Sequence, residues 1–543
     1  MVAGILLLSG RIASGKSSLA QGLSRSSQAV LVSTSELLKK AAAENDIDLK
    51  DRRALQEFGT AKDRDTDGRW LADALQVQVD SAQPDQFLVV DAVRLSEQIV
   101  AIRSRFGRLV THVHLTAFEA DLVQRYSSRA RATDRSTSFA AASSDLTERQ
   151  VETLAPLADL HINTSTSAPE DVVVRCLARM GRLSSLDSRL VDVLVGGQYG
   201  SEGKGNIAYY LAPEYDVLLR VGGPNAGHKV PTEPVVTHRS LPSGALSNPA
   251  APLLIGPGAT VSPSVLLAEI ADSGVDPSRV HIDPQATVIS GSDLKSERPL
   301  KVAIGSTGQG VGAAISRRIR DRSTGKVQLA KDVPALQPFV KRPVVDLLEE
   351  AYAANRRVLL EGTQGAGLSL YHGIYPYVTS RDTSAAGCLA EAGIGFGRVR
   401  RVVMVVRTFP IRVQGSSGPM GREISWQEVA RRSGFDVDDL TRSEKSSVQR
   451  KLRRVAEFDW RALRMAAQLN TPTDLALTFA DYLNARNSLA YRYDQLQVET
   501  REFVEEVEAV ASAPVSLISG RFTDRSVIDR RRWRGHLPGT IGG

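Results

Sequence analysis

The stretch VDVLVGGQYGSEGKGNIAYYLA, residues 191–212, decides the fold of most of this chain. It begins with an apolar, β-branched run, continues through a loop with five glycines, and ends in an apolar helical pattern. This order is typical of a strand, a glycine-rich loop and a helix, in which backbone N–H groups and the helix N-terminus attract an anion. Lys204 adds a positive charge to the loop. We therefore expect a phosphate-binding turn here.

A second glycine-rich turn follows about twenty residues later. It reads GGPNAGH, residues 222–228, and ends in an imidazole, His228. A lone histidine is more often structural than catalytic, but one that follows such a turn can exchange a proton near neutral pH. We interpret the two turns together as a site.

The N-terminus carries a separate phosphate-binding pattern. An apolar run, residues 4–8, leads into SGRIASGKSS, residues 9–18, in which Gly10, Gly15, Lys16 and Ser17 fit G-x-x-x-x-G-K-[ST] and Ser18 opens the expected helix, residues 18–23. Backbone amides would hold the phosphates, Lys16 would contact the β and γ oxygens, and the Ser17 hydroxyl would bind Mg²⁺.

Further residues fit the same site. Asp91 ends an apolar strand, residues 87–90, where ligands of parallel sheets gather, so we expect it near the Mg²⁺, with Arg94 beside it. The alternative is an ordinary acidic residue at a strand end. An arginine-bearing lid over the phosphates is predicted from Arg125, Arg129, Arg131 and Arg135, although solvated charge runs are common. A last strand, residues 160–163, and a helix ending near Met180 complete this unit.

Length and composition limit the class of protein. A chain of 543 residues is too long for a single domain with one hydrophobic core, so we expect at least two domains. The polar stretch at residues 184–189 separates a predicted domain of residues 1–183 from one of residues 190–543. No apolar run is long enough to span a bilayer, and no secretion signal is visible, so we expect a cytoplasmic protein without a membrane partner. Cys176 and Cys388 are expected to be buried, without a disulfide framework.

Charge favours polyanionic ligands. The formal net charge is +7, which suits nucleotides and also nucleic acids. Aromatic residues make up only 5% of the chain and no RNA-binding aromatic motif is present, so we prefer small nucleotides and expect no nucleic-acid partner.

The two turns of the second domain also carry a family resemblance. GGQYGSEGKG followed by RVGGPNAGHKV resembles the adenylosuccinate synthetase family, whose usual pattern is GxQWGDEGKGK and then RxxGGxNAGH. The resemblance covers about two-thirds of the chain, from Val191 to the C-terminus. The first domain is similar to P-loop kinases of the nucleoside-monophosphate or dephospho-coenzyme-A type. Both domains are thus expected to be α/β folds with a central, mostly parallel sheet.

The resemblance implies a set of site residues. His228 matches a catalytic histidine that acts at the 6-oxygen of the substrate, and Ser201 takes the position of the catalytic aspartate. Gly227 is implied as a ligand of Mg²⁺. The implied nucleotide and phosphate contacts are Gly200, Glu202, Gly203, Lys204, Gly205, Asn225, Ala226, Gly227, Thr307, Gln364, Thr379, Arg453, Arg454, Asp481, Ser519 and Gly520. Lys451 and Arg453 are implied to hold L-aspartate. A homodimer is implied too, with Arg320 or Arg322 crossing to the partner's site.

Three departures from the family pattern change the expected chemistry. Ser201 cannot act as a general base near neutral pH without a partner, so either another base acts or the substrate differs. The family's aspartate-binding loop, TTGRxRR, is replaced here by VQRKLRR, residues 448–454. The family's base-specificity motif, TKxD, is replaced by TFAD, residues 478–481. Since serine is smaller than aspartate, it leaves room for a 2-amino group, as in the 2-aminoadenylosuccinate synthetase branch.

Three hypotheses follow. The first is a ligase that joins L-aspartate to a 6-oxopurine nucleotide, using ATP or GTP and Mg²⁺, fused to an ATP-dependent nucleotide kinase. Within it we favour GMP or dGMP over IMP as acceptor. The second is a nucleotide kinase whose synthetase-like domain is a non-catalytic nucleotide sensor. The third is a nucleic-acid-binding protein, for which steep salt dependence would be the sign.

Overall fold

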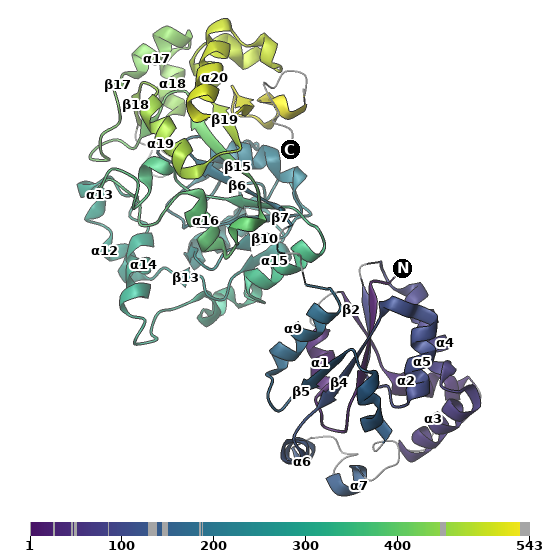
Figure 1. Cartoon of the computed structure of the whole chain (residues 1–543). Helices are drawn as coiled ribbons and strands as arrows, with labels where there is room; N and C mark the ends of the chain where they lie inside the picture. The colour runs from purple at the N-terminus through teal and green to yellow at the C-terminus, as the bar shows by residue number, and fades with distance from the viewer. Residues whose placement is uncertain are drawn as a thin grey trace. The chain divides into compact units, whose positions relative to one another are not determined.

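The computed structural model describes residues 2–24, 28–44, 47, 52–84, 86–128, 138–143, 150–183, 186, 188–445 and 452–532. The chain divides into two compact units, Met1–Leu183 and Ser184–Gly543 (Figure 1). Each unit has its own sheet and its own hydrophobic core. We describe them separately.

The first unit is built on a five-stranded parallel sheet of order β2-β3-β1-β4-β5. Its strands are β1 Gly4–Ser9, β2 Ala29–Val32, β3 Phe87–Val90, β4 Val110–Thr116 and β5 Leu160–Asn163. Its helices are α1 Lys16–Leu23, α2 Thr34–Ala43, α3 Arg52–Thr66, α4 Arg69–Ser81, α5 Ser96–Phe106, α6 Glu119–Ser127, α7 Phe139–Ser143 and α9 Pro169–Arg179.

The central strands β1 and β3 are buried on both faces, which explains why they are almost continuously apolar. Along β1, Ile5 and Leu7 pack into one core with α4 and α5, whereas Leu6 and Leu8 pack into another with α1 and α9. The carboxyl ends of β1 and β3 therefore meet at one edge, directly beside the start of α1.

The second unit is built on a nine-stranded sheet of order β12-β10-β7-β14-β6-β15-β19-β20-β21. All neighbours are parallel except β20 and β21. These strands are β6 Val191–Gly196, β7 Val217–Arg220, β10 Leu253–Ile255, β12 Val280–Ile282, β14 Val358–Glu361, β15 Val399–Arg407, β19 Asp474–Thr478, β20 Val515–Ser519 and β21 Val527–Asp529.

Helices and smaller sheets surround this central sheet. The helices are α10 Lys204–Leu211, α11 Pro263–Ser273, α12 Gly291–Ser296, α13 Leu300–Ala303, α14 Val311–Arg320, α15 Val344–Ala353, α16 Ala385–Ala392, α17 Trp426–Ser433, α18 Val437–Ser443, α19 Trp460–Asn470 and α20 Val498–Ala511. The small sheets pair β8 His228–Val230 with β9 Val236–His238, β11 Thr260–Val261 with β13 Thr287–Val288, and β18 Arg454–Ala456 with β16 Ile411–Arg412 and β17 Glu423–Ile424.

The predicted fold class is confirmed, because both units are α/β with mostly parallel sheets. The strands predicted at residues 87–90 and 160–163 occur as β3 and β5. Helix α1 starts at Lys16, two residues earlier than predicted, since Gly15 adopts the left-handed conformation at its N-cap. Both cysteines are free and buried, as expected. In the described part of the chain, no helix combines the length and the apolar character needed to cross a bilayer.

Candidate active site

The glycine-rich loop after β6 is held together by a buried ion pair. Glu202 Oε1 accepts hydrogen bonds from the backbone N–H groups of Gln198 and Gly200, at 2.9 and 2.8 Å. Its other oxygen, Oε2, lies 2.6 Å from Lys204 Nζ, and both side chains are almost completely buried. Gly200 and Gly203 have positive φ angles, 93° and 86°, which favour glycine at these turns. The loop is therefore preorganised before any ligand arrives.

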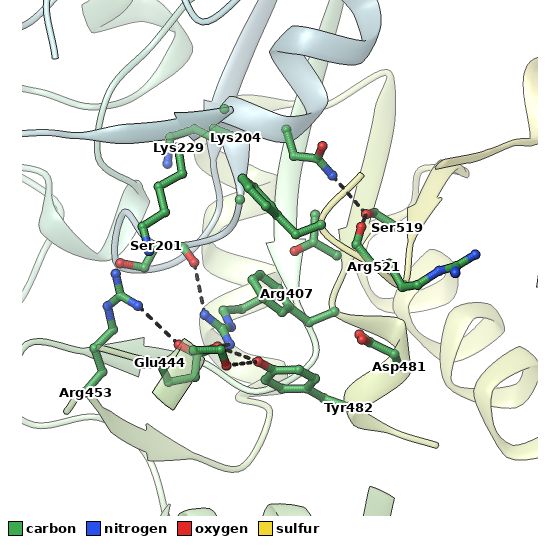
Figure 2. A pocket seen from close by; sticks show the side chains of 18 of the residues that line it. Ser201, Lys204, Lys229, Arg407, Glu444, Arg453, Asp481, Tyr482, Ser519 and Arg521 are labelled. Atoms are coloured by element: carbon green, nitrogen blue, oxygen red, sulfur yellow. Dashed lines mark hydrogen bonds and ion pairs between the residues drawn. The ribbon is translucent and has the colours of Figure 1, made fainter. Parts of the chain in front are cut away.

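A cavity of about 570 Å³ opens beside this loop. Figure 2 shows the side chains that line it. The predicted site residues that it brings together are Gly200, Ser201, Gly203, Lys204, Gly205, Gly227, His228, Arg453, Asp481, Ser519 and Gly520. Residues 200–205, Asp481, Ser519 and Gly520 follow or end the parallel strands β6, β19 and β20, where ligands of α/β folds bind, whereas Gly227, His228 and Arg453 lie at or directly before the strands β8 and β18 of two small antiparallel sheets. The volume is that of an ordinary small-molecule site.

His228 stands at the start of β8 and is oriented by a buried carboxylate. Its Nδ1 is hydrogen-bonded to Glu361 Oε1, at the end of β14. Glu361 also accepts a 2.7 Å bond from the backbone N–H of Ser243 and is paired with Arg220. A carboxylate only accepts hydrogen bonds, so the proton of the neutral ring lies on Nδ1. The Nε2 atom is buried and has no hydrogen-bond partner among the described residues.

Burial and charge keep this imidazole neutral. Burial, and then the nearby Arg220, lower the pKa of His228 to about 4, against the opposing effect of Glu361. Burial alone would raise the pKa of Glu361, but Arg220 and the bonds from His228 and Ser243 hold it at about 2. At neutral pH the pair therefore consists of a carboxylate and a neutral ring whose Nε2 is a hydrogen-bond acceptor.

Ser201 lies next to a network that the sequence analysis missed. Arg407 donates to the carbonyl oxygen of Ser201 at 3.2 Å and to Glu444 Oε1 at 2.9 Å. Glu444 also accepts bonds from Tyr482 Oη at 2.8 Å and from Arg453 at 3.2 Å. Arg407 ends a buried apolar strand, which is a signal that sequence reading could have used. One buried carboxylate thus fixes two arginines on the cavity wall.

Lys229 is a second residue that the sequence analysis missed. It follows His228 and lines the cavity. Burial, and then the positive charge of Arg453, lower the pKa of Lys229. In Figure 2, Ser201, Lys229 and Arg453 lie on one side of the pocket, whereas Asp481 and Ser519 lie on the other. Two cations near one another at a partly buried site favour an anionic ligand.

Several implied site residues lie outside the cavity wall. Gln364 donates to Thr379 Oγ1 at 3.1 Å, and Arg454 binds Glu423 and the carbonyl oxygen of Gly418. Asn225, Ala226 and Thr307 belong to neighbouring loops and do not line the cavity. Lys451 lies outside the described residues, so its implied role in holding aspartate stays a prediction.

The first unit contains the loop predicted from the G-x-x-x-x-G-K-[ST] pattern. Gly10 and Gly15 have φ angles of 137° and 99°. Lys16 donates to the loop carbonyl oxygens of Gly10 and Arg11. The hydroxyl-bearing side chains of Ser17 and Ser18 are exposed in the first turn of α1. Such a loop presents backbone N–H groups, a lysine and a hydroxyl to a phosphate and its Mg²⁺.

Asp91 lies at the end of β3, as predicted, beside the loop-bearing strand β1. It accepts two hydrogen bonds from Thr34, from the backbone N–H at 2.9 Å and from the hydroxyl at 3.0 Å. Arg94 follows on the same segment. Of the predicted lid, Arg125 belongs to α6 and donates to Thr164 at 2.8 Å. Arg129, Arg131 and Arg135 lie outside the described residues, so the lid stays a prediction.

A preformed phosphate loop, a cavity at the strand ends and an oriented histidine define a nucleotide-binding enzyme. The family model of adenylosuccinate synthetase matches residues 193–333 and 327–511. The synthetase of Pyrococcus horikoshii is 38% identical over 349 residues, which cover 62% of this chain and 98% of that protein. The synthetase of Methanocaldococcus jannaschii is 36% identical, with coverage of 62% and 96%.

Solved structures of similar fold point to the same family as the sequence relatives. The succinoaminodeoxyadenylate synthetase of cyanophage S-2L, solved with dGMP and with dATP as an energy donor, is 28% identical with a TM-score of 0.53, covering 64% of this chain and 98% of that one. The Plasmodium falciparum adenylosuccinate synthetase is 19% identical at the same TM-score, covering 63% and 100%, and shows the fold alone. The chain belongs to the adenylosuccinate synthetase family, and its second unit is a ligase of that type.

Proposed function

We propose that the second unit joins L-aspartate to a guanine nucleotide, GMP or dGMP, at the expense of a nucleoside triphosphate. The observation that carries this proposal is Ser201, a small uncharged residue in the cavity that also holds His228. It leaves room for a 2-amino group and carries no charge. The cyanophage relative, which was solved with dGMP, supports the same acceptor. IMP is the competing acceptor.

The chain's own residues account for a phosphoryl transfer followed by a displacement. Lys204 and the loop amides bind the triphosphate, whose γ-phosphoryl group passes to the 6-oxygen of the purine. The purine loses its N1 proton in this step, and we assign that proton to Nε2 of His228, since serine is a poor base. The aspartate amino group then attacks C6. The C6–O bond breaks, and phosphate leaves with the former 6-oxygen.

The site fits Mg²⁺ held mainly by phosphate oxygens. Mg²⁺ usually keeps several waters and takes few protein ligands. Gly227 lines the cavity and can offer its carbonyl oxygen, and Ser17 can offer its hydroxyl in the first unit. No cluster of three or more His, Cys, Asp or Glu side chains suited to a metal occurs within the described ranges. When bound, the ion would neutralise charge on the transferring phosphoryl group.

We assign the dicarboxylate to Lys229 and Arg453, two cations that lie on one side of the cavity. We expect Lys229→Met to raise the KM for L-aspartate about 10- to 100-fold with a smaller effect on the KM of the nucleotides, because one charge-assisted bond is lost. Steady-state kinetics with each substrate varied in turn checks this. Arg442→Met, which removes an exposed arginine of α18, is the matched control. An unchanged KM for aspartate would exclude Lys229 from this role.

The acceptor is tested by mass spectrometry. The purified chain is mixed with Mg²⁺, L-aspartate and ATP or GTP, and dGMP, GMP or IMP is offered separately. We expect an adduct whose mass is that of the guanine nucleotide plus aspartate minus one water. An adduct formed from IMP alone would contradict the guanine proposal and would mean that the second unit catalyses the ordinary reaction of adenine nucleotide synthesis.

We also propose that the first unit is an ATP-dependent nucleotide kinase, because Lys16 and Ser17 begin α1 after the glycine-containing loop and Asp91 follows β3, the strand paired with β1. Lys16→Ala should lower phosphoryl transfer by the first unit at least about 100-fold, since it removes a charge that stabilises the transferring phosphate. Nucleoside-monophosphate acceptors are screened by ATP consumption. Lys204→Ala, the matched change in the other loop, should abolish adduct formation instead. Loss of both activities in either variant would contradict two separate sites.

The sensor hypothesis remains the second candidate, and Ser201 favours it because the family's base is missing. It predicts nucleotide binding by the second unit without consumption of L-aspartate. The acceptor assay distinguishes it from the ligase, since a sensor yields no adduct with any of the three nucleotides.

A further inference from the structure

A second polar site lies beside the cavity, around the side chain of Arg239. This residue follows β9, is half-buried and packs along the second glycine-rich turn, with its Cγ 3.9 Å from the position that a Cβ on Gly227 would take. Its Nε donates to the carbonyl oxygen of Pro224 at 3.0 Å, and its Nη2 donates to the side-chain oxygen of Gln309 at 2.5 Å. Arg239 thus connects this turn to the loop that contains Gln309.

The charge of Arg239 has no counter-ion within the described ranges. Both of its hydrogen-bond partners are neutral, and it forms no ion pair there. The acidic neighbour Glu269 is bonded to His238 and to the backbone N–H groups of residues 239–241. Burial lowers the pKa of Arg239, against the opposing effect of Glu269. Because a half-buried charge without a partner is costly, this guanidinium indicates a site for an anion.

Arg279 shows how a structural arginine is satisfied in the same unit. It is also half-buried and forms no ion pair with a described carboxylate. Its Nε, Nη1 and Nη2 atoms all donate to backbone carbonyl oxygens, those of Ala251, Ala245 and Asn248. By contrast, Nη1 of Arg239 donates to no described residue. Arg239 therefore keeps N–H donors for a ligand, whereas Arg279 has used its donors within the fold.

The loop that contains Gln309 also brings two threonines to neighbouring segments. Its residue Thr307 offers a carbonyl oxygen to the side-chain amide of Gln309 at 3.3 Å. A few residues later, a Cβ on Gly312 would lie 3.0 Å from the Cβ of Ser380, which follows Thr379. The two threonines thus lie on two segments that are in direct contact.

Three neutral groups of these segments have hydrogens to donate. In the part of the chain that the structure describes, the hydroxyl of Thr307 and the side-chain amide of Asn225 form no hydrogen bond, although one polar atom of that amide is buried. The hydroxyl of Thr379 accepts a bond from Gln364 at 3.1 Å, so its own proton is free to be donated. Such a set of donors beside a guanidinium suits an anion with several oxygens, such as a phosphate monoester.

We propose that Arg239 binds the 5′-phosphate of the acceptor nucleotide, beside the three neutral donors of the neighbouring segments. This inference rests on the proposed ligase function. The triphosphate of the donor is assigned to the loop of Lys204, and the dicarboxylate to Lys229 and Arg453, so the monophosphate is the remaining anion among the substrates. The turn along which Arg239 packs ends in His228. A nucleotide whose purine meets His228 therefore has its phosphate further along the same turn.

This charge has a different source from the one that the family resemblance implied. The resemblance pointed to an arginine of a partner chain, Arg320 or Arg322. In this structure Arg320 is paired with the adjacent Asp321, at 2.6 Å, and its side chain is 70% exposed. Arg239 instead supplies the cation from the chain that also carries His228 and the phosphate loop.

The test measures the Kd of dGMP and of deoxyguanosine, which lacks the phosphate, by calorimetry with the full chain. Wild type, Arg239→Met and Arg239→Lys are compared, and thermal melting checks that each protein is folded. The KM values of dGMP, ATP and L-aspartate are measured in adduct formation. Arg279→Met is the matched control, because it removes a half-buried arginine that is bonded to backbone carbonyl oxygens. The first unit is the same in all four proteins, so its own binding of nucleotides is common to them.

We expect Arg239→Met to raise the Kd and the KM of dGMP about 10- to 100-fold, because a charge-assisted bond to the phosphate is lost. The Kd of deoxyguanosine and the KM values of ATP and L-aspartate should stay unchanged. Arg239→Lys keeps the charge without the planar fork and should lie between wild type and Arg239→Met. Arg279→Met should lower the melting temperature and keep the wild-type Kd for both ligands.

Three results would overturn the inference. The first is an unchanged Kd of dGMP in Arg239→Met. The second is an equal loss of affinity for dGMP and deoxyguanosine, which would mean that Arg239 only holds the turn in place. The third is a wild type that binds dGMP no better than deoxyguanosine. If wild type forms no adduct, the ligase proposal fails, and the Kd values still decide the inference by the same criteria.

Discussion

Ser201→Asp should change the acceptor from a guanine nucleotide to IMP. A carboxylate at this position supplies a general base, which typically contributes 10²- to 10⁴-fold, so adduct formation from IMP should rise about 100-fold. The longer side chain also takes the space of the 2-amino group, and overpacking of about 1–3 kcal/mol should lower the rate with dGMP about 5- to 150-fold. Arg407, Lys229 and Arg453 surround this side of the pocket and would keep the new carboxylate ionised.

Rates with separate acceptors, measured by chromatography of the adduct, check this result. Ser201→Ala is the control, because it adds neither volume nor charge and should retain the preference for guanine. If Ser201→Asp kept the wild-type preference, the size of the residue at this position would not determine the acceptor.

His228→Ala should lower kcat for adduct formation about 10³-fold, since the imidazole Nε2 is the proton acceptor in the proposed step. Nucleotide binding should change far less. In wild type, the pKa of about 4 means that this group is neutral from pH 6 to pH 8, so its contribution to the rate should stay constant there and fall only as the pH drops through 4. Single-turnover rates and nucleotide affinities measured across this range separate the two effects.

His238 provides a matched control on the same hairpin. It pairs with His228 across β8 and β9, is fully buried, and has its own carboxylate partner, Glu269. It does not line the cavity. His238→Gln should therefore reduce thermal stability and retain most of kcat. If His228→Ala kept more than about a tenth of kcat while folded, proton transfer would have to be assigned to another group.

The sequence predicted those parts of the site that are local in the chain. Both phosphate loops were found because a strand, closely spaced glycines and a lysine occupy one short segment. The strands were found because parallel sheets covered on both faces require continuous apolar runs, as in β1 and β6.

The partners of these residues could not be predicted, because folding brings them from distant segments. Glu361, which orients His228, lies 133 residues further along the chain, and Glu444 lies 37 residues beyond Arg407. Neither pairing leaves a spacing pattern that a single sequence reveals. Burial has the same limitation, because Asp481 and Asp439 are residues of the same type, and only the fold shows that Asp481 is shielded from water whereas Asp439 is exposed.

The most direct test of the account follows the 6-oxygen of the acceptor. The chain is given dGMP labelled with ¹⁸O at C6, together with L-aspartate, Mg²⁺ and ATP, and the phosphate released is analysed by mass spectrometry. Because the proposed ligase breaks the C6–O bond after phosphoryl transfer, we expect one ¹⁸O atom in each phosphate formed with the adduct, and none in the adduct itself. Unlabelled phosphate with intact, labelled dGMP would mean that the second unit hydrolyses or merely binds nucleotides, and would contradict the account.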